Sequence, residues 1–226
     1  VGLITRRSQV QILPPLPTFP CGRQCSGGRL LLKAAADNAF PGWREFNRMA
    51  GMGGWRDRDA GAGPYWYVDE EGRLLSDDSP GPAGSHGDRI PFEIVVRADH
   101  PVTRGLPRRW LHAADELYAR LRGPGERMTV LATAWSDPAN QGTGRHEPQL
   151  LAMDYGRGRV FHTTLGHDAT GLASVDFVVT FQRGTEWAAT AEVTLPAPAE
   201  FPGMDRPLLR PDLAALAESP DGRGQP

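Results

Sequence analysis

The segment from Asp154 to Asp168 places the strongest constraint on the fold, because it predicts a strand that ends at a histidine. Gly156 and Gly158 permit a tight turn, and the β-branched and aromatic run 160–165 then stops at a glycine just before His167. In open α/β sheets the ligand crevice lies beyond the carboxyl ends of the strands. His167 and its neighbouring aspartate are therefore a candidate site. The alternative is a surface turn with a solvated His-Asp pair.

Composition limits the classes of partner. The 226 residues are 39% hydrophobic and 23% charged, which suits one globular domain. A formal net charge of -2 argues against nucleic-acid binding, and no apolar run approaches the ~20 residues of a membrane helix. Cys21 and Cys25 have no second pair to complete a zinc site.

The first 26 residues do not resemble the rest of the chain. Residues 8–14 resemble the translated 3′ arm of a transfer-RNA gene, and Gln and Pro residues interrupt the apolar core that a signal peptide needs. We therefore interpret residues 1–26 as a spurious or disordered leader, with the true amino terminus missing, and we expect a cytoplasmic protein. The folded domain is predicted at 27–202, and 203–226 is predicted to be a disordered, Pro-rich tail.

Hydrophobic periodicity predicts strands and helices that follow one another along the domain. The predicted strands are 29–36, 90–96, 128–135, 149–155 and 159–165, and the predicted helices lie after 36, at 111–121 and at 172–190. The junction after 36 carries Asp37 and Asn38, where a helix start directs backbone N–H groups into the crevice. These two residues either contact a ligand or serve only as helix caps.

Aromatic and acidic residues supply further candidates. Trp55, Trp66 and His86 lie in the Gly-rich stretch 51–88, where flat rings could stack on sugar faces. Alternatively the rings hold the loop onto the domain, and His86 is polar surface.

Another group of candidates follows the strand at 90–96. Asp115, Glu116 and Tyr118 fall within the predicted helix 111–121, and Glu147 ends a polar loop. Either Asp115 or Glu116 contacts substrate or metal, or Glu116 forms an i,i+4 salt bridge with Arg120.

The sequence resembles the trehalose-utilisation (ThuA-like) family from about Gly27 to about Pro202. The resemblance rests on nine blocks in family order, namely Ala35–Phe40, Gly53–Trp55, His86–Gly87, His100–Pro101, Asp115–Tyr118, His146–Pro148, Tyr155–Phe161, Gly166–His167 and Arg183–Ala188. It implies a fold like class I glutamine amidotransferases, a flavodoxin-like α/β sandwich with a mainly parallel sheet. It also implies a role in bacterial use of trehalose and related sugars, including 3-keto sugars.

Two departures from that pattern shape the functional hypothesis. Amidotransferases would have a nucleophilic cysteine where this chain has Ala34 to Ala36, so a cysteine-dependent amidotransferase is excluded. By the same comparison Gly166 to Asp168 hold the place of the catalytic histidine and acid. The first β-α units of the family are absent, so we expect a truncated chain that is marginally stable or aggregation-prone. A soluble monomer melting cooperatively above ~45 °C would contradict this expectation.

Three hypotheses follow. In the first, a carbohydrate-processing enzyme uses His167 as acid/base and Asp115 or Glu116 as its carboxylate partner. The substrate contacts would come from Asp37, Asn38, Trp55, Trp66, His86, Tyr118 and Glu147. A metal-assisted variant would bind zinc or manganese through His86, His162 and His167, with Glu147 as a further ligand.

The second hypothesis is a non-catalytic sugar-binding module, and the third is an inactive truncated fragment. All three leave the sugar, the reaction, any cofactor and the oligomeric state open.

Overall fold

The computed structural model describes residues 29–31, 36 and 42–213. The strands are β1 (Arg29–Leu31), β2 (Tyr65–Val68), β3 (Leu74–Asp77), β4 (Ile90–Val96), β5 (Arg109–Asp115), β6 (Met128–Ser136), β7 (Arg145–Tyr155) and β8 (Gly158–Thr163). The helices are α2 (Arg44–Ala50), α3 (Ala169–Ala173) and α4 (Val175–Thr190), with 3-10 turns at Ala60–Ala62 and Pro138–Asn140. No described helix combines the length and the apolar character needed to cross a membrane.

The sheet is mainly antiparallel. Its strands run in the order β1-β8-β7-β6-β4-β5, with β2 paired to the start of β7 and β3 paired to β2. Among the described strands only β1 and β8 pair in parallel. The prediction of a mainly parallel, flavodoxin-like or glutamine amidotransferase-like sandwich is therefore wrong. The turn between Tyr155 and Gly158 shows why, because a two-residue hairpin joins antiparallel strands whereas parallel strands need a long crossover.

The predicted helix at 111–121 is also wrong. Its first half belongs to β5, which pairs antiparallel with β4. The second half leaves the sheet without forming a helix and makes isolated bridges, Ala119 with Ser85 and Arg122 with both Gly53 and Tyr65. Pairing with β4 outweighs the helical spacing of the apolar side chains. The predicted helix at 172–190 is confirmed as α4.

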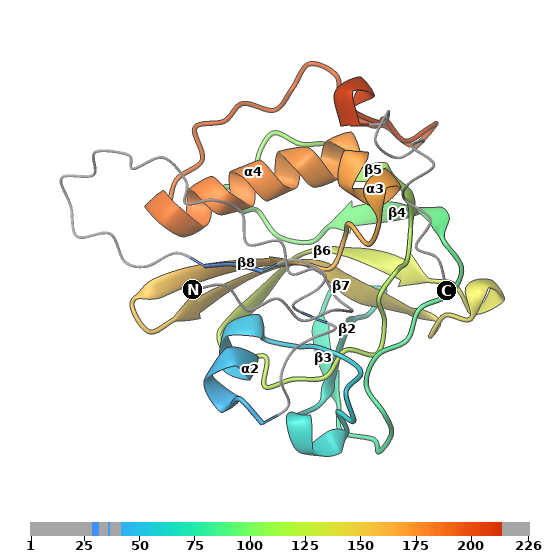
Figure 1. Cartoon of the computed structure of the whole chain (residues 1–226), viewed down its shortest axis with the longest axis vertical. Coiled ribbons are helices and arrows are strands. Elements are labelled where there is room, and N and C mark those ends of the chain that lie inside the picture. Colours follow the sequence, from blue (N-terminus) through green and yellow to red (C-terminus); the bar gives the residue numbers. More distant parts are fainter. Residues whose placement is uncertain (1–28, 32–35, 37–41, 214–226) are drawn as a thin grey trace, which may run out of the picture.

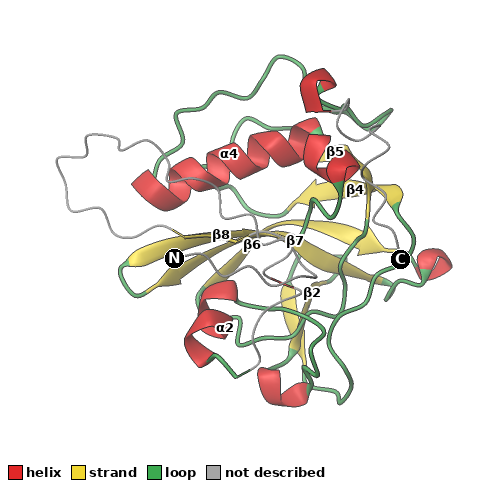
Figure 2. Cartoon of the chain, in the orientation of Figure 1, coloured by secondary structure: helices red, strands yellow, loops and turns green. Residues whose placement is uncertain are grey.

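The two faces of the sheet bury two separate cores, as the alternation along β7 shows. Leu150 and Ala152 pack into the core beneath α4, whereas Leu151 and Met153 pack on the opposite face. This separation follows from the period of two of a β-strand. Figure 1 and Figure 2 show α4 across one face of the sheet, with α2 and the β2–β3 hairpin on the other. The carboxyl end of β8 lies between these layers and leads into α3.

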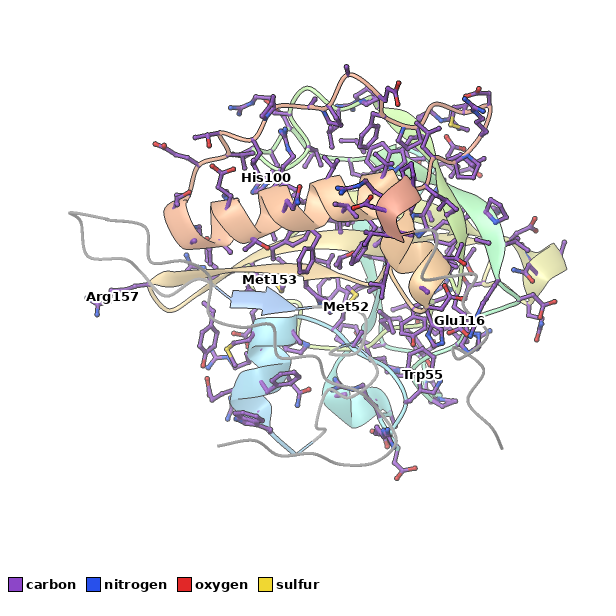
Figure 3. The ribbon with its side chains drawn as sticks, turned by 45° about the horizontal axis from the view of Figure 1, so that its top comes forward. Met52, Trp55, His100, Glu116, Met153 and Arg157 are labelled. Atoms are coloured by element: carbon purple, nitrogen blue, oxygen red, sulfur yellow. The ribbon has the colours of Figure 1, made fainter. Side chains whose placement is uncertain are left out.

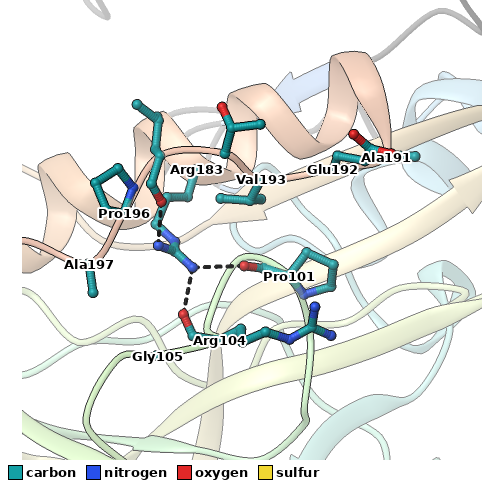
Figure 4. Close-up of a pocket in the computed structure, with 11 residues that line it drawn as sticks. Pro101, Arg104, Gly105, Arg183, Ala191, Glu192, Val193, Pro196 and Ala197 are labelled. Carbon is teal, nitrogen blue, oxygen red and sulfur yellow. Dashed lines mark hydrogen bonds between the residues drawn. The ribbon is translucent and has the colours of Figure 1, made fainter.

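Arg183 of α4 ties the loops at one end of the molecule together. Its guanidinium donates to the carbonyl oxygens of Pro101 at 2.9 Å, Val102 at 2.8 Å, Arg104 at 2.6 Å and Leu195 at 2.7 Å. Pro101, Arg104, Arg183 and Leu195 border a hollow of about 520 Å³ (Figure 4). Because backbone carbonyls occupy the guanidinium, Arg183 acts as a clamp between α4 and the loops around it.

Candidate functional site

Glu116 stands at the centre of a cluster of charged side chains just after β5. Its side chain is 10% exposed, and Oε2 lies 2.9 Å from Nδ1 of His167 and 3.9 Å from Nε2 of His86. Arg89 donates from Nε to Oε1 of Glu116 at 3.3 Å and from Nη1 to Oδ2 of Asp168 at 2.8 Å. We call these five residues the histidine–glutamate cluster. The carboxylate of Glu116 thus joins two imidazoles and a guanidinium.

The turn after β8 places His167 in this cluster. Gly166 has a φ of +88°, and a Cβ there would lie 2.8 Å from Phe177 and 2.9 Å from Leu172. A glycine is therefore required for the chain to turn sharply over α3 and α4. Asp168 caps α3 by accepting the N–H of Gly171 at 3.0 Å. The Gly-His-Asp sequence thus ends the strand, exposes the histidine and starts the helix.

Asp115 lies fully buried beneath the cluster and holds its backbone. The carboxylate accepts N–H groups from Gly166 at 2.6 Å, His167 at 3.0 Å and Glu116 at 2.8 Å. Three such bonds fix the two chain segments that carry the paired His167 and Glu116. Asp115 therefore positions the cluster, because its oxygens bind backbone N–H groups and do not face the open side of the cluster.

A second buried layer supports Asp115. His112 lies between two carboxylates, with Nε2 3.2 Å from Asp115 and Nδ1 2.8 Å from Asp176, which also accepts from Nε1 of Trp110 at 2.8 Å. Burial alone would lower the pKa of His112, but the Asp176 and Asp115 carboxylates outweigh it and raise that pKa to about 9. His112 is thus a buried cation at neutral pH. Sequence reasoning missed it, although its alternation with Trp110 along the chain was a detectable strand signal.

Aromatic rings form a wall beside the cluster. Trp55 packs on Tyr118 with 4.5 Å between ring centroids and lies 6.1 Å from His86, while Tyr118 lies 6.5 Å from His167. Figure 3 shows Trp55 and Glu116 on the same side of the molecule. Flat rings next to ionisable groups are the combination that binds and orients a sugar.

The backbone that carries Trp55 is strained. Trp55, Arg56 and Asp57 have φ values of 57°, 52° and 59°, three successive non-glycine residues in the left-handed region. The N–H of Trp55 donates to the carbonyl of Ala83 at 2.8 Å, which holds the turn in place. Such strain costs about 1–3 kcal/mol per residue and is typical of functional sites.

The structure brings together five of the predicted site residues, His86, Glu116, Tyr118, His167 and Trp55, with Asp115 directly beneath them. Glu116 does not form the helical pair with Arg120 that was the alternative, since the chain is not helical there.

Three other predicted residues, Trp66, Glu147 and His162, do not join this group. Trp66 and Glu147 line a separate hollow, and Asp37 and Asn38 lie outside the described residues. His162 is buried under α2, where its Nδ1 contacts the carbonyl oxygen of Ala50 at 2.8 Å, so it does not meet His86 and His167. Over residues 29–31, 36 and 42–213, no three His, Cys, Asp or Glu side chains are grouped so as to hold a metal ion.

The comparisons with known proteins place this site in a family. A family model described as trehalose utilisation, ThuA, matches residues 24–188. The chain belongs to the ThuA family. The match spans every residue of the histidine–glutamate cluster and the buried pair His112 and Asp176.

A solved structure with substantial sequence identity agrees with this assignment. A ThuA-like protein from Parabacteroides merdae ATCC 43184 is 43% identical to this chain, with a TM-score of 0.78 over 83% of this chain and 69% of that one. A ThuA-like protein from Bacteroides uniformis ATCC 8492 is 16% identical, with a TM-score of 0.47 over 74% of this chain and 62% of that one. The search of curated proteins found no match.

Proposed function

We propose that this ThuA-family protein processes a carbohydrate, trehalose or a related keto-disaccharide, with His167 as the acid/base. The observation that carries the proposal is the 2.9 Å contact between Nδ1 of His167 and the largely buried carboxylate of Glu116. The His167 side chain is 34% exposed, so a substrate can reach it. A histidine oriented by a carboxylate is suited to proton transfer near neutral pH.

The geometry suggests how the groups share the work. With Nδ1 held by Glu116, the ring atom for proton exchange with a sugar is Nε2, and the carboxylate stabilises the imidazolium that forms. His86, whose Nε2 lies 3.9 Å from the same oxygen of Glu116, is a second group that can donate or accept a proton. The proton that His167 accepts would come from a sugar hydroxyl or from the carbon beside a keto group.

The aromatic wall and Arg89 would hold the sugar and the carboxylates in place. Trp55, which is partly exposed, offers a ring face next to His86, and the buried Tyr118 supports it from behind. Arg89 bridges Glu116 and Asp168, so it fixes the start of α3 relative to the end of β5. The same two ion pairs favour a second candidate function, a non-catalytic sugar-binding module. Arg89 already pairs with both carboxylates in the absence of a substrate, which suits a structural role for them.

Turnover and binding assays on the full chain separate the two functions. We expect 3-keto-trehalose to be turned over, and His167→Ala to lower kcat by about 10²–10⁴-fold while calorimetry still detects binding within a few-fold. Glu116→Gln should lower kcat in the same way. His146→Ala is the matched control, because His146 of β7 packs against Trp135 of β6, away from the cluster. Binding without turnover by the unmodified protein would establish the binding module, and turnover that survives His167→Ala would reject the proposed acid/base.

A further inference from the structure

A second hollow lies between the β2–β3 hairpin and the start of β7. It has a volume of about 360 Å³, and Trp66, Tyr67, Asp77, Arg120, Arg145 and Glu147 are among the residues that line it. Small-molecule sites begin at about this size. The hollow combines aromatic rings with two guanidinium groups and a buried carboxyl, and none of these residues belongs to the histidine–glutamate cluster.

Glu147 forms the buried floor of this hollow. The residue is 3% exposed, and its Oε1 accepts from Oγ1 of Thr143 at 2.7 Å, while the N–H of Arg120 donates to the same carboxyl. Burial raises the pKa of Glu147 to about 7, although these hydrogen bonds and the charges of Arg145 and Arg120 act in the opposite direction. A buried carboxyl that titrates near neutrality in a hollow is typical of ligand sites.

Arg120 supplies the positive charge of the rim. Its φ is 55°, and its backbone is held in this conformation because its carbonyl accepts the N–H of Gly84 at 2.9 Å and its own N–H binds Glu147. The side chain is exposed at the mouth of the hollow. The two backbone hydrogen bonds therefore fix the position from which the Arg120 side chain extends.

The other charged groups of the hollow neutralise each other. Nη1 of Arg145 lies 2.8 Å from Oδ2 of Asp77, and its guanidinium covers the ring of Tyr67 at 4.3 Å from the centroid. Trp66 is anchored by Nε1, which donates to the carbonyl of Gly123 at 2.8 Å, so its ring forms a fixed wall. The net charge of the hollow therefore comes from Arg120 and Glu147.

We propose that this hollow is a second ligand site, which binds a sugar bearing an anionic group, either a phosphate ester or a carboxylate. Arg120 binds the anionic group, the Glu147 carboxyl hydrogen-bonds a sugar hydroxyl, and the Trp66 ring packs beside the sugar. The site is distinct from the histidine–glutamate cluster, but the two share a wall, because Tyr118 faces the cluster and Arg120 lines the hollow two residues later.

Calorimetry on the full chain tests the proposal with four probes, glucose 6-phosphate, glucuronate, glucose and inorganic phosphate. We expect one or both anionic sugars to bind at least about tenfold more tightly than glucose or phosphate alone. The anionic sugar that binds more tightly identifies the natural source of the charge. Equal binding of glucose, equal binding of inorganic phosphate, or no binding of either anionic sugar would overturn the proposal.

Variants then locate the bound ligand. Arg120→Gln should weaken binding about tenfold or more, with circular dichroism to show that the variant folds. His167→Ala should leave this affinity unchanged, so failure here is distinct from failure of the acid/base proposal. Loss of binding in His167→Ala but not in Arg120→Gln would place the ligand in the cluster and overturn the second site.

The pH dependence gives an independent readout with glucuronate, whose carboxylate stays ionised over the range used. As the pH rises from 6 to 8, Glu147 loses its proton and becomes an anion facing the ligand, alongside Arg120, Arg145 and Asp77. Affinity should therefore fall several-fold over this range, and Glu147→Gln should abolish the fall. If the affinity fell equally in the unmodified protein and in Glu147→Gln, Glu147 would not be part of the ligand site.

Discussion

The charge of His112 decides how the residues under the histidine–glutamate cluster are held. Two carboxylates buried without a cation would repel each other, and each would have to be stripped of water. His112 lies within 3.2 Å of Asp115 and 2.8 Å of Asp176, and the pKa of Asp176 is lowered although burial acts to raise it. The cation therefore keeps the Asp176 carboxylate ionised, and its other ring nitrogen holds Asp115, whose oxygens bind three backbone N–H groups of the site.

Replacing His112 by Gln should lower the free energy of unfolding by roughly 3–5 kcal/mol, because it leaves two buried carboxylates without their cation. Urea unfolding at pH 7 measures this loss. Arg127→Ala is the matched control, since Arg127 and Asp154 form an exposed pair at 3.3 Å that should contribute at most about 1 kcal/mol. A loss below about 1 kcal/mol for His112→Gln would show that His112 is neutral in the folded protein.

The contrast between His167 and His112 shows what could be predicted from the sequence at this scale. His167 follows a glycine at the end of an apolar run, so its exposure could be predicted from local residues alone. The role of His112 depends on Asp176, which lies 64 residues away on α4 and becomes its neighbour only through the fold. Long-range pairs of this kind have no signature in a single sequence.

At the scale of elements, β5 and the segment after it show where local patterns failed. Ala114, Leu117, Tyr118 and Leu121 have helical spacing, yet the structure places the first in a strand and the others in an irregular segment. The short β7–β8 hairpin has the opposite character, since the residues of its predicted tight turn are adjacent in the chain and the turn is present. Elements set by neighbouring residues could be predicted, whereas β5 depends on β4, and the segment after β5 depends on Ser85 and Gly53.

The Arg183 clamp belongs to this scale, because one side chain joins α4 to two loops. Lys in its place keeps the charge but has one nitrogen, so it cannot reach four carbonyls in different directions. We expect Arg183→Lys to cost roughly 2–3 kcal/mol of unfolding free energy and to raise hydrogen exchange in residues 101–104 and 191–197. Arg104→Lys is the control, since its exposed side chain makes only a 3.7 Å contact with Asp99. Equal exchange in Arg183→Lys and the unmodified protein would contradict the clamp.

For the whole molecule, one sheet with two cores brings buried titratable groups into both layers. His112 lies on the α4 side, His162 lies under α2, and Glu147 lies at the floor of the second hollow. Burial and neighbouring charges shift the pKa of each group away from its ordinary value. The dependence of the unfolding free energy on pH therefore depends on groups in both layers. The sign of each contribution follows from whether the group's folded pKa lies above or below its unfolded value.

Stability should rise gently from about pH 4.5 to 6.5 and then fall towards pH 9. The folded pKa of Glu147, about 7, exceeds its usual value of 4.5, so its contribution is present below 4.5 and lost as the pH rises through 7. His112, with a folded pKa of about 9 against 6.5, loses its contribution between those values. His162 and His100 act oppositely, since burial lowers the pKa of each from 6.5 to about 4, and together they outweigh Glu147 at acid pH.

Urea unfolding from pH 4 to 9.5 tests this profile, and two variants separate its parts. Glu147→Gln should remove the loss between pH 4.5 and 7 and so make stability rise more steeply with pH there, because the opposing effects of His162 and His100 remain. His112→Gln should flatten the limb between 6.5 and 9, at a lower overall stability. Stability that increased from pH 7 to 9 in the unmodified protein would mean that the charged His112 does not stabilise the fold, and the layer beneath the site would then be held by packing rather than by charge.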